Sequence, residues 1–284
     1  MDFRGEFVVE PGARVKLRKL DPAYTARLSE EEERPEIENH LEHLRRLQFL
    51  LYAERRRGLL VVLQGLDASG KDGTLRHVFG AMNPQGTTVT AFREPTDEEL
   101  AHDFLWRVHP HAPGKGEVAI FNRSHYEDVF AARVRGLVPR DVWEGRYELI
   151  NDFEKLLHRA GTHVVKFLLH ISPEEQLRRF EARLDDPARG WKISEDDYRA
   201  RQHWDSYLQA FEDALERTST KHAPWYVIPA DHKWFRNLAV SQIVAATLED
   251  LGMRVPPPRV DLAAIRRRYH RAARRRRGGR AART

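Results

Sequence analysis

The sequence contains no cysteine and no long apolar run, and both absences limit what the protein can be. Without cysteine there is no disulfide, no thiolate zinc site and no cysteine nucleophile. No apolar stretch approaches the roughly 20 residues that a membrane-spanning helix needs. The first ten residues carry acids and no apolar signal core, so we expect a cytoplasmic protein that does not act at a membrane. Its 284 residues suffice for one large α/β domain with extensions.

Acidic residues are also absent after Asp261, where ten arginines follow up to Arg283. Without these ten arginines the chain has 38 basic and 43 acidic residues, a balance of −5 that the net charge of +5 hides. We expect residues 253–284 to form a proline-containing linker and a disordered basic tail. The alternative is that this tail binds nucleic acid or another polyanion, which would make the protein a binding protein.

An apolar segment from Leu59 to Gln64 leads directly into a glycine-rich loop. Residues 65–74 read GLDASGKDGT, and helix-forming residues follow. This is the arrangement of a phosphate-binding loop, in which glycines let backbone N–H groups point inward and a lysine adds positive charge. The residues that we expect to bind phosphate are Gly65, Ala68, Ser69, Gly70, Lys71, Asp72 and Gly73.

The loop departs from the usual pattern G-x-x-x-x-G-K-[ST] at one position. Asp72 replaces the serine or threonine whose hydroxyl normally holds magnesium, and Asp67 places another carboxylate inside the loop. We therefore expect Asp67 to take over the contact with the metal ion. A glycine-rich turn with a surface lysine is the structural alternative, but it does not explain why Lys71 follows the second glycine so soon after an apolar strand.

Strand and helix patterns alternate along the chain. Strands are predicted at 59–64, 87–92, 118–121, 164–171 and 225–229, and helices at 36–57, 71–82, 96–108, 141–160, 172–185, 196–217 and 234–251. This alternation predicts an α/β fold of three layers, a parallel sheet with helices on both faces, over residues 36–252. Residues 1–35 are predicted to form an irregular N-terminal arm. Ligands of such folds gather at the carboxyl ends of the strands.

A polar segment, residues 122–128, follows a short apolar run that predicts a buried strand. Phosphate-loop kinases usually place an aspartate at the end of this strand to hold magnesium. Here the residue is Asn122, and Asp67, Glu127 and Asp128 are the carboxylates available. Magnesium needs only one or two carboxylates beside substrate phosphates, so we expect Asp67, Asn122 and Asp128 to bind Mg²⁺, with Mn²⁺ as a second candidate. The alternative is a polar loop whose charges pair with one another.

Arginines follow several of the predicted strands. Arg123 can grip a phosphate with two N–H groups, and Arg93 stands where nucleoside monophosphate kinases often hold the phosphate of the acceptor. The segment 178–195 predicts a helical lid that closes over a polyphosphate chain. Its phosphate-binding candidates are Arg179, Arg183, Arg189 and Lys192. The alternative is that these cations form ion pairs on a solvated surface, as Arg93 could with Glu94.

With these residues in view, the chain closely resembles the family-2 polyphosphate kinases over residues 10–252. The matching stretches are residues 65–74, 121–128, 166–171, 191–194 and 218–231. The resemblance implies a phosphate-loop kinase fold similar to thymidylate kinase. It also implies magnesium-dependent, reversible transfer of a terminal phosphoryl group between inorganic polyphosphate and a nucleotide, by a homodimer or homotetramer.

The resemblance also implies roles for particular residues. Asp67 and Lys71 match the loop residues that the family needs for activity, while Asn122, Arg123 and the lid arginines match the rest of its site. ADP-specific members usually carry Asp-Arg-Ser at the strand end and asparagine at the position of Glu127. This chain has Asn122 and Glu127 instead, so it resembles the subgroup that phosphorylates both AMP and ADP. Guanine nucleotides are further candidate acceptors.

The predicted chemistry needs no general base, because the attacking phosphate oxygen is already anionic near neutral pH. Catalysis then depends on positioning and on neutralising the charge of two polyanions. The predicted catalytic residues are Asp67, Lys71, Arg123 and Asp128, and those in contact with the nucleotide are Arg93, Asn122 and Glu127. An ATP-dependent nucleoside monophosphate kinase is the alternative enzyme, although the missing hydroxyl after Lys71 argues against it.

Overall fold

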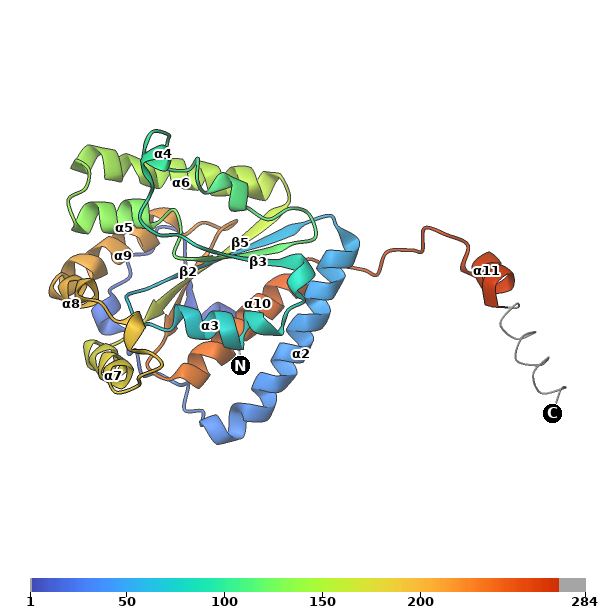
Figure 1. Cartoon of the computed structure of the whole chain (residues 1–284), viewed down its shortest axis with the longest axis horizontal. Helices are drawn as coiled ribbons and strands as arrows, with labels where there is room; N and C mark the ends of the chain where they lie inside the picture. Colours follow the sequence, from blue (N-terminus) through green and yellow to red (C-terminus); the bar gives the residue numbers. More distant parts are fainter. Residues whose placement is uncertain (1, 271–284) are drawn as a thin grey trace. The chain divides into compact units, whose positions relative to one another are not determined.

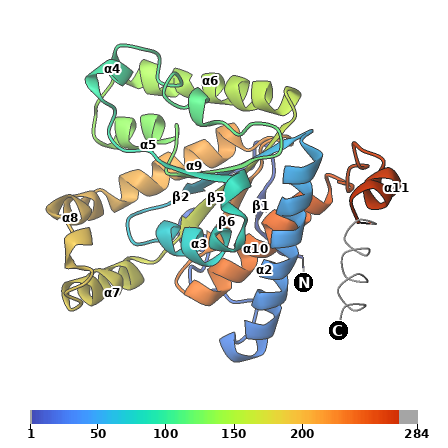
Figure 2. The same cartoon turned by 45° about the vertical axis from the view of Figure 1, so that its right-hand side comes forward.

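Six strands form one sheet in the order β1-β6-β5-β2-β4-β3 (Figure 1, Figure 2). Their bounds are Val8–Val9 for β1, Gly58–Gln64 for β2, Thr87–Ala91 for β3, Val118–Asn122 for β4, Thr162–His170 for β5 and Trp225–Pro229 for β6. All neighbours run parallel except β1, which pairs antiparallel with β6 through Val8 opposite Tyr226. The predicted parallel α/β sheet is therefore confirmed, with one short antiparallel edge strand added.

The computed structural model describes residues 2–270 and divides the chain into two units, Met1–Met253 and Arg254–Thr284. The longer helices are α2 (Glu30–Glu54), α5 (Glu127–Val134), α6 (Arg140–Arg159), α7 (Pro173–Leu184), α8 (Glu195–Gln202), α9 (Trp204–Thr218) and α10 (Lys233–Glu249). The shorter ones are α1 (Phe3–Phe7), α3 (Lys71–His77), α4 (Asp97–Leu100) and α11 (Leu262–Ile265), with single turns at Leu17–Lys19, Phe79–Ala81, Pro84–Gly86, His109–His111, Gly190–Lys192 (η5) and Arg266–His270.

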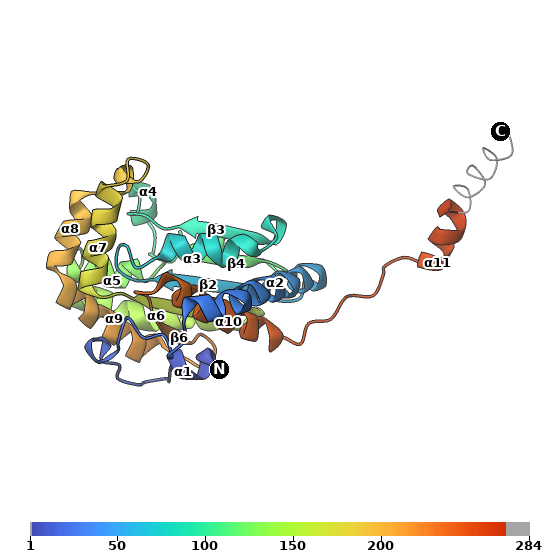
Figure 3. The same ribbon diagram turned by 90° about the horizontal axis from the view of Figure 1, so that it is seen from below.

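Helices cover both faces of the sheet, which gives the predicted three layers (Figure 1, Figure 3). Because side chains alternate along a strand, Leu59, Val61 and Leu63 of β2 pack with α2 and α10 on one face. Leu60 and Val62 of the same strand pack with α5, α6 and α9 on the other. The buried strand is fully apolar up to Gln64, where the glycine-rich loop begins.

The N-terminal segment is more regular than the irregular arm that we predicted for residues 1–35. It forms α1 and β1, and Phe3 and Phe7 are buried in the core with their rings against Phe235 of α10. The second helix begins at Glu30 and not at Glu36, because the side chain of Ser29 accepts a hydrogen bond from the first turn and caps it. The sequence patterns did not predict α1 and β1, because both elements are short and are stabilised by partners that are distant in the chain.

Three predicted helices are shorter or divided in the structure, and the one expected over 71–82 ends at His77. The helix expected over 96–108 ends at Leu100, since Asp103 accepts a hydrogen bond from the N–H of Leu105 and favours a turn. The helix expected over 196–217 is interrupted at His203, which separates α8 from α9. Conversely, α5 was not predicted, although it begins inside the polar segment that follows β4.

Within residues 2–270, no helix has the length and apolar character to cross a membrane. The second unit contains α11, whose first turn is capped by Asp261. Most of the predicted basic tail, residues 271–284, lies outside the described residues. The predictions that this tail is disordered or binds nucleic acid therefore remain predictions.

Candidate active site

The glycine-rich loop joins β2 to α3 at the carboxyl end of the sheet, near α7 (Figure 1). Two of its glycines have backbone conformations that L-residues rarely adopt, with φ of +143° at Gly65 and +108° at Gly70. A Cβ atom at Gly65 would lie 2.7 Å from the carbonyl oxygen of Leu169, and one at Gly70 would lie 1.8 Å from Nη1 of Arg236. The positive φ favours glycine at both positions, and at Gly65 the close approach of the β5 backbone excludes a side chain as well.

The side chain of Lys71 lies over the loop, where its Nζ donates hydrogen bonds to the carbonyl oxygens of Gly65 (2.6 Å) and Leu66 (3.1 Å). Only 8% of Lys71 is exposed. Burial, together with the nearby charge of Arg123, lowers the pKa of its ammonium group to about 8, and the carboxylate of Asp67 partly opposes this shift. The ammonium group is thus held at the loop and is sensitive to the charges around it.

Asp67 and Arg123 meet across the site as an ion pair. Arg123 follows β4 in a left-handed conformation, with φ of +62°, and its N–H donates to the carbonyl oxygen of Leu63. Burial alone would raise the pKa of the Asp67 carboxyl, but the positive charges of Lys71, Arg123 and Arg183 outweigh burial and lower it. Asp67 is therefore a stable anion in a positively charged site.

Glu127, in the first turn of α5, lies 3.9 Å from Arg123. Burial raises the pKa of its carboxyl, and the charges of Arg123 and Lys71 only partly offset this. The side-chain amide of Gln64, oriented so that its nitrogen donates, reaches an oxygen of Glu127 at 2.9 Å. The structure therefore brings Glu127 into the same site as the loop.

Asp72 connects the loop with the strand end and with the predicted lid. It accepts hydrogen bonds from the amide of Asn122 (3.0 Å) and from Nζ of Lys192 (3.2 Å) in η5. Burial would raise the pKa of the Asp72 carboxyl, but these two bonds and the charges of Lys192 and Lys71 together outweigh burial and lower it. The residue that replaces the usual serine or threonine thus holds two of the predicted site residues beside the loop.

Arg179 of α7 contacts the loop in a way that differs from our prediction. Its buried guanidinium donates to the carbonyl oxygens of Ala68 (2.8 Å), Ser69 (3.2 Å), Ala230 (2.7 Å) and Asp231 (2.8 Å). Because its donors bind backbone oxygens, Arg179 holds the loop in place. We predicted instead that it contacts polyphosphate from a lid.

The other predicted arginines are distributed unevenly. Arg183 lies close enough to Asp67 for its charge to lower the pKa of that carboxyl. Arg189 pairs with Asp186 at 2.9 Å near the surface. The side chain of Arg93 is exposed, and its carbonyl oxygen accepts a hydrogen bond from Arg107 at 2.8 Å. Of these three, Arg183 is therefore the one whose charge acts on a carboxylate of the loop.

Asp128 was predicted as a metal ligand, but its carboxylate lies 3.1 Å from Nη2 of Arg107. Within residues 2–270 no group of three or more histidine, aspartate or glutamate side chains is arranged to hold a metal ion. The chemistry of Asp67 and Asn122 nevertheless fits a divalent cation that takes most of its oxygens from phosphates and water. Arg107 was missed because the segment between β3 and β4 carries no recognisable motif.

A buried polar network supports the segment after β4. Nζ of Lys166 lies 2.5 Å from Glu154 and 3.0 Å from the hydroxyl of Tyr126, which also donates to Glu154. His125 is fully buried, and its Nε2 lies 3.4 Å from Glu154. This placement agrees with a structural and not a catalytic interpretation of His125, and it fixes the start of α5 next to the site.

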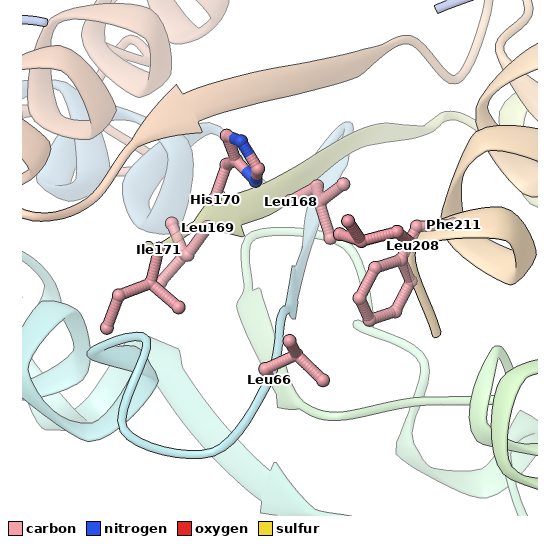
Figure 4. A pocket seen from close by; sticks show the side chains of 7 residues that line it. All are labelled: Leu66, Leu168, Leu169, His170, Ile171, Leu208 and Phe211. Carbon is pink, nitrogen blue, oxygen red and sulfur yellow. The ribbon is translucent and has the colours of Figure 1, made fainter. Parts of the chain in front are cut away.

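A small cavity of about 10 Å³ lies behind the loop at the end of β5 (Figure 4). Its lining residues are Leu66, Leu168, Leu169, His170, Ile171, Leu208 and Phe211. Such a volume holds about one water molecule, so the cavity is not the substrate site. The surface formed by Asp67, Lys71, Asn122, Arg123 and Glu127 is the better candidate, because it joins a phosphate-binding loop to several facing cations.

Comparison with known proteins identifies one family of relatives. The family model described as Polyphosphate kinase 2 (PPK2) matches residues 27–255. An AMP/ADP-polyphosphate phosphotransferase from Meiothermus ruber is 48% identical and covers 89% of this chain and 96% of its own. An ADP-polyphosphate phosphotransferase from Rhodopseudomonas palustris is 42% identical, with coverage of 88% and 91%. The crystal structure of Polyphosphate Kinase 2 from Arthrobacter aurescens TC1 is similar with a TM-score of 0.86 and 42% identity, covering 91% of this chain and 96% of that one.

Proposed function

The chain belongs to the polyphosphate kinase 2 family, and we propose that it transfers the terminal phosphoryl group of inorganic polyphosphate to AMP and ADP, reversibly. One observation carries this proposal most directly. Lys71, Arg123 and Asp67 converge at a phosphate-binding loop in which Asp72 replaces the usual hydroxyl. An ATP-gripping loop normally uses that hydroxyl for magnesium, so the altered loop fits a donor other than ATP.

In the proposed reaction, an oxygen of the acceptor phosphate attacks the terminal phosphorus of polyphosphate. The bond from that phosphorus to the bridging oxygen breaks, and the shortened chain leaves with the bonding electrons. Lys71 and the loop N–H groups neutralise the donor, while Arg123 covers the oxygens of the group in transfer. Arg183 and Lys192 add positive charge from the side of α7. No proton has to be removed, because the attacking oxygen is an anion.

We assign the divalent cation as Mg²⁺, with Mn²⁺ as a substitute, and Asp67 and Asn122 as the residues that would hold it. When bound, the ion would reduce the repulsion between donor and acceptor phosphates. Asp67 suits this role because its pKa is lowered and it stays anionic. Asp128 is the weaker candidate, since Arg107 already pairs with its carboxylate.

The use of both AMP and ADP is supported by Glu127 and by the name of the relative from Meiothermus ruber. Glu127 is next to Arg123 and can position the shorter acceptor, through the ribose or through the metal ion. Arg93 remains a proposed contact of the nucleotide, since its side chain is exposed at the end of β3. Guanine nucleotides are proposed as further acceptors, and the cytoplasm as the location.

A homo-oligomer is also proposed, and helix α6 supports it. Val142, Leu149 and Leu156 are 41%, 52% and 54% exposed and recur every seven residues as one apolar stripe. An apolar hollow of about 780 Å³, lined in part by Trp106, Leu149 and Leu156, adjoins the stripe. Asp141 and Arg159 are separated by five helical turns. Antiparallel pairing of two α6 helices would therefore join each Asp141 to Arg159 of the other copy.

The proposed function is tested by supplying AMP or ADP with either polyphosphate or ATP as donor, with and without Mg²⁺, and reading out the nucleotides formed. Polyphosphate-driven synthesis of ADP and ATP is expected. Use of ATP alone would instead identify an ATP-dependent nucleoside monophosphate kinase. Lys71→Ala and Asp67→Ala should abolish the transfer while the protein remains folded, and near-wild-type turnover of either variant would exclude the mechanism.

A further inference from the structure

Arg236 lies in the first turn of α10, directly beneath the phosphate-binding loop. It is 2% exposed, and the position of a Cβ atom at Gly70 would be 1.8 Å from its Nη1. The corresponding position at Gly73 is 2.9 Å from its Nη2. Helices α3 and α10 contact each other, and the guanidinium of Arg236 lies close to the backbone of both glycines.

No carboxylate pairs with this buried arginine in the part of the chain that the structure describes. Three arginines are buried there, and two of them have anionic partners: Arg107 pairs with Asp128, and Arg179 with Glu175. Arg236 donates only to the side-chain oxygen of Asn237, at 2.8 and 3.2 Å. Burial, and the like charge of Arg179, lower the pKa of its guanidinium to about 9.

A buried charge without a counter-ion is unfavourable, and a protein usually avoids it by pairing or by neutralising the group. The place of this charge is informative, because Gly70 and Gly73 belong to the loop that we propose to bind the phosphates. We propose that Arg236 acts as a positioning residue for polyphosphate: its fixed positive charge behind the loop strengthens polyanion binding without touching the ligand. The proposal rests on the proposed function, because it adds one more residue to the same polyphosphate site.

This role also explains a feature of the loop sequence. Gly73 follows Lys71 by two residues, inside the first turn of α3, where glycine is unfavourable for a helix. A side chain there would approach the guanidinium of Arg236. Glycine at position 73 therefore leaves room for the guanidinium of Arg236 next to the start of α3.

The test measures ligand binding and stability together. In Arg236→Met, removal of an unpaired buried charge should leave the melting temperature of the free protein unchanged or raise it. Binding of inorganic tripolyphosphate, measured by calorimetry without nucleotide, should weaken by about tenfold or more, within the range typical of coupling between separate groups. The KM for polyphosphate should rise more than kcat falls. Arg236→Lys, which retains the charge, should keep most of the affinity.

The matched control is Arg140→Met, which removes one exposed arginine from the start of α6 and tests for a general effect of net charge. It should bind tripolyphosphate like the wild type. Equal affinity of wild type and Arg236→Met would overturn the proposal. A second result would also overturn it: Arg236→Lys loses as much affinity as Arg236→Met, and both variants have a lower melting temperature. That result is expected if Arg236 only stabilises the fold. If the wild type itself bound no tripolyphosphate, the proposed function would fail instead.

Discussion

The guanidinium of Arg123, just after β4, forms an ion pair with the carboxylate of Asp67, in the loop after β2. The two residues are 56 positions apart in the chain, yet the parallel order of β2 and β4 brings their loops together. The pair connects the carboxylate proposed to hold the metal ion with the arginine proposed to cover the transferred group. The contribution of each residue to activity can be measured beside its contribution to the stability of the fold.

Asp67→Asn should reduce polyphosphate-driven ATP synthesis by about 100-fold or more, because the amide keeps the size of the side chain but loses the charge. The melting temperature should change little, since partly exposed ion pairs contribute about 0–1 kcal/mol. Asp250→Asn, which removes an exposed carboxylate paired with Arg4, is the control and should leave turnover unchanged. Full activity of Asp67→Asn would show that its charge is not needed.

Glu127→Asn should reduce kcat/KM for AMP more than for ADP, by about tenfold in the ratio, if Glu127 positions the shorter acceptor. The measurement is a steady-state comparison of the two acceptors at saturating polyphosphate. The partly buried carboxyl is replaced by a smaller group without charge, so its pairing with Arg123 is lost as well. An equal loss for AMP and ADP would remove Glu127 from the discrimination between acceptors.

The pKa of Lys71 predicts opposite effects of pH on stability and on binding. Burial lowers this pKa to about 8 in the folded protein, so the penalty for burying the charge is present below pH 8. The penalty disappears as pH rises towards the unfolded value of about 10.4, and the free energy of unfolding should therefore rise over this window. Polyphosphate affinity should fall over the same window. In Lys71→Met both trends should weaken, and unchanged trends would contradict the assignment.

The buried ion pair between Lys166 and Glu154 should be important for stability. Both side chains are 0% exposed, so Glu154→Gln leaves the ammonium group without its anion and should cost about 3–5 kcal/mol. Denaturant unfolding provides the measurement. The double variant Glu154→Gln with Lys166→Met should lose less than the sum of the single variants, because no buried charge remains. Additive losses would show that the two groups act independently.

The apolar stripe on α6 should hold two copies together. Leu149→Glu with Leu156→Glu should reduce the molecular mass measured by light scattering, as charged side chains disrupt the contact. Leu184→Glu, also at an exposed leucine, is the control and should not alter the mass. Asp141→Arg and Arg159→Asp should each weaken association, and their combination should restore it. A monomeric wild type would contradict the proposed contact.

Local patterns in the sequence are sufficient to predict much of the fold and the identity of the loop. The continuous apolar run from Leu59 to Leu63 is a local pattern, and buried parallel strands are recognised by runs of this kind. A phosphate-binding loop requires backbone conformations that favour glycine at positions 65 and 70. Its lysine, Lys71, follows the second of these glycines. The short elements α1 and β1 were missed because distant partners stabilise them.

The tertiary structure decided which charges face the loop. Arg179 could be read from the sequence as a lid residue, but the packing of α7 directs its donors at the carbonyl oxygens of the loop. Asp128 could be read as a metal ligand, but Arg107 approaches it from a segment without a motif. Arg236 lies 166 residues after Gly70 and has no local signal at all. Electrostatic interactions depend on distance in space, and only the packing of distant segments sets those distances.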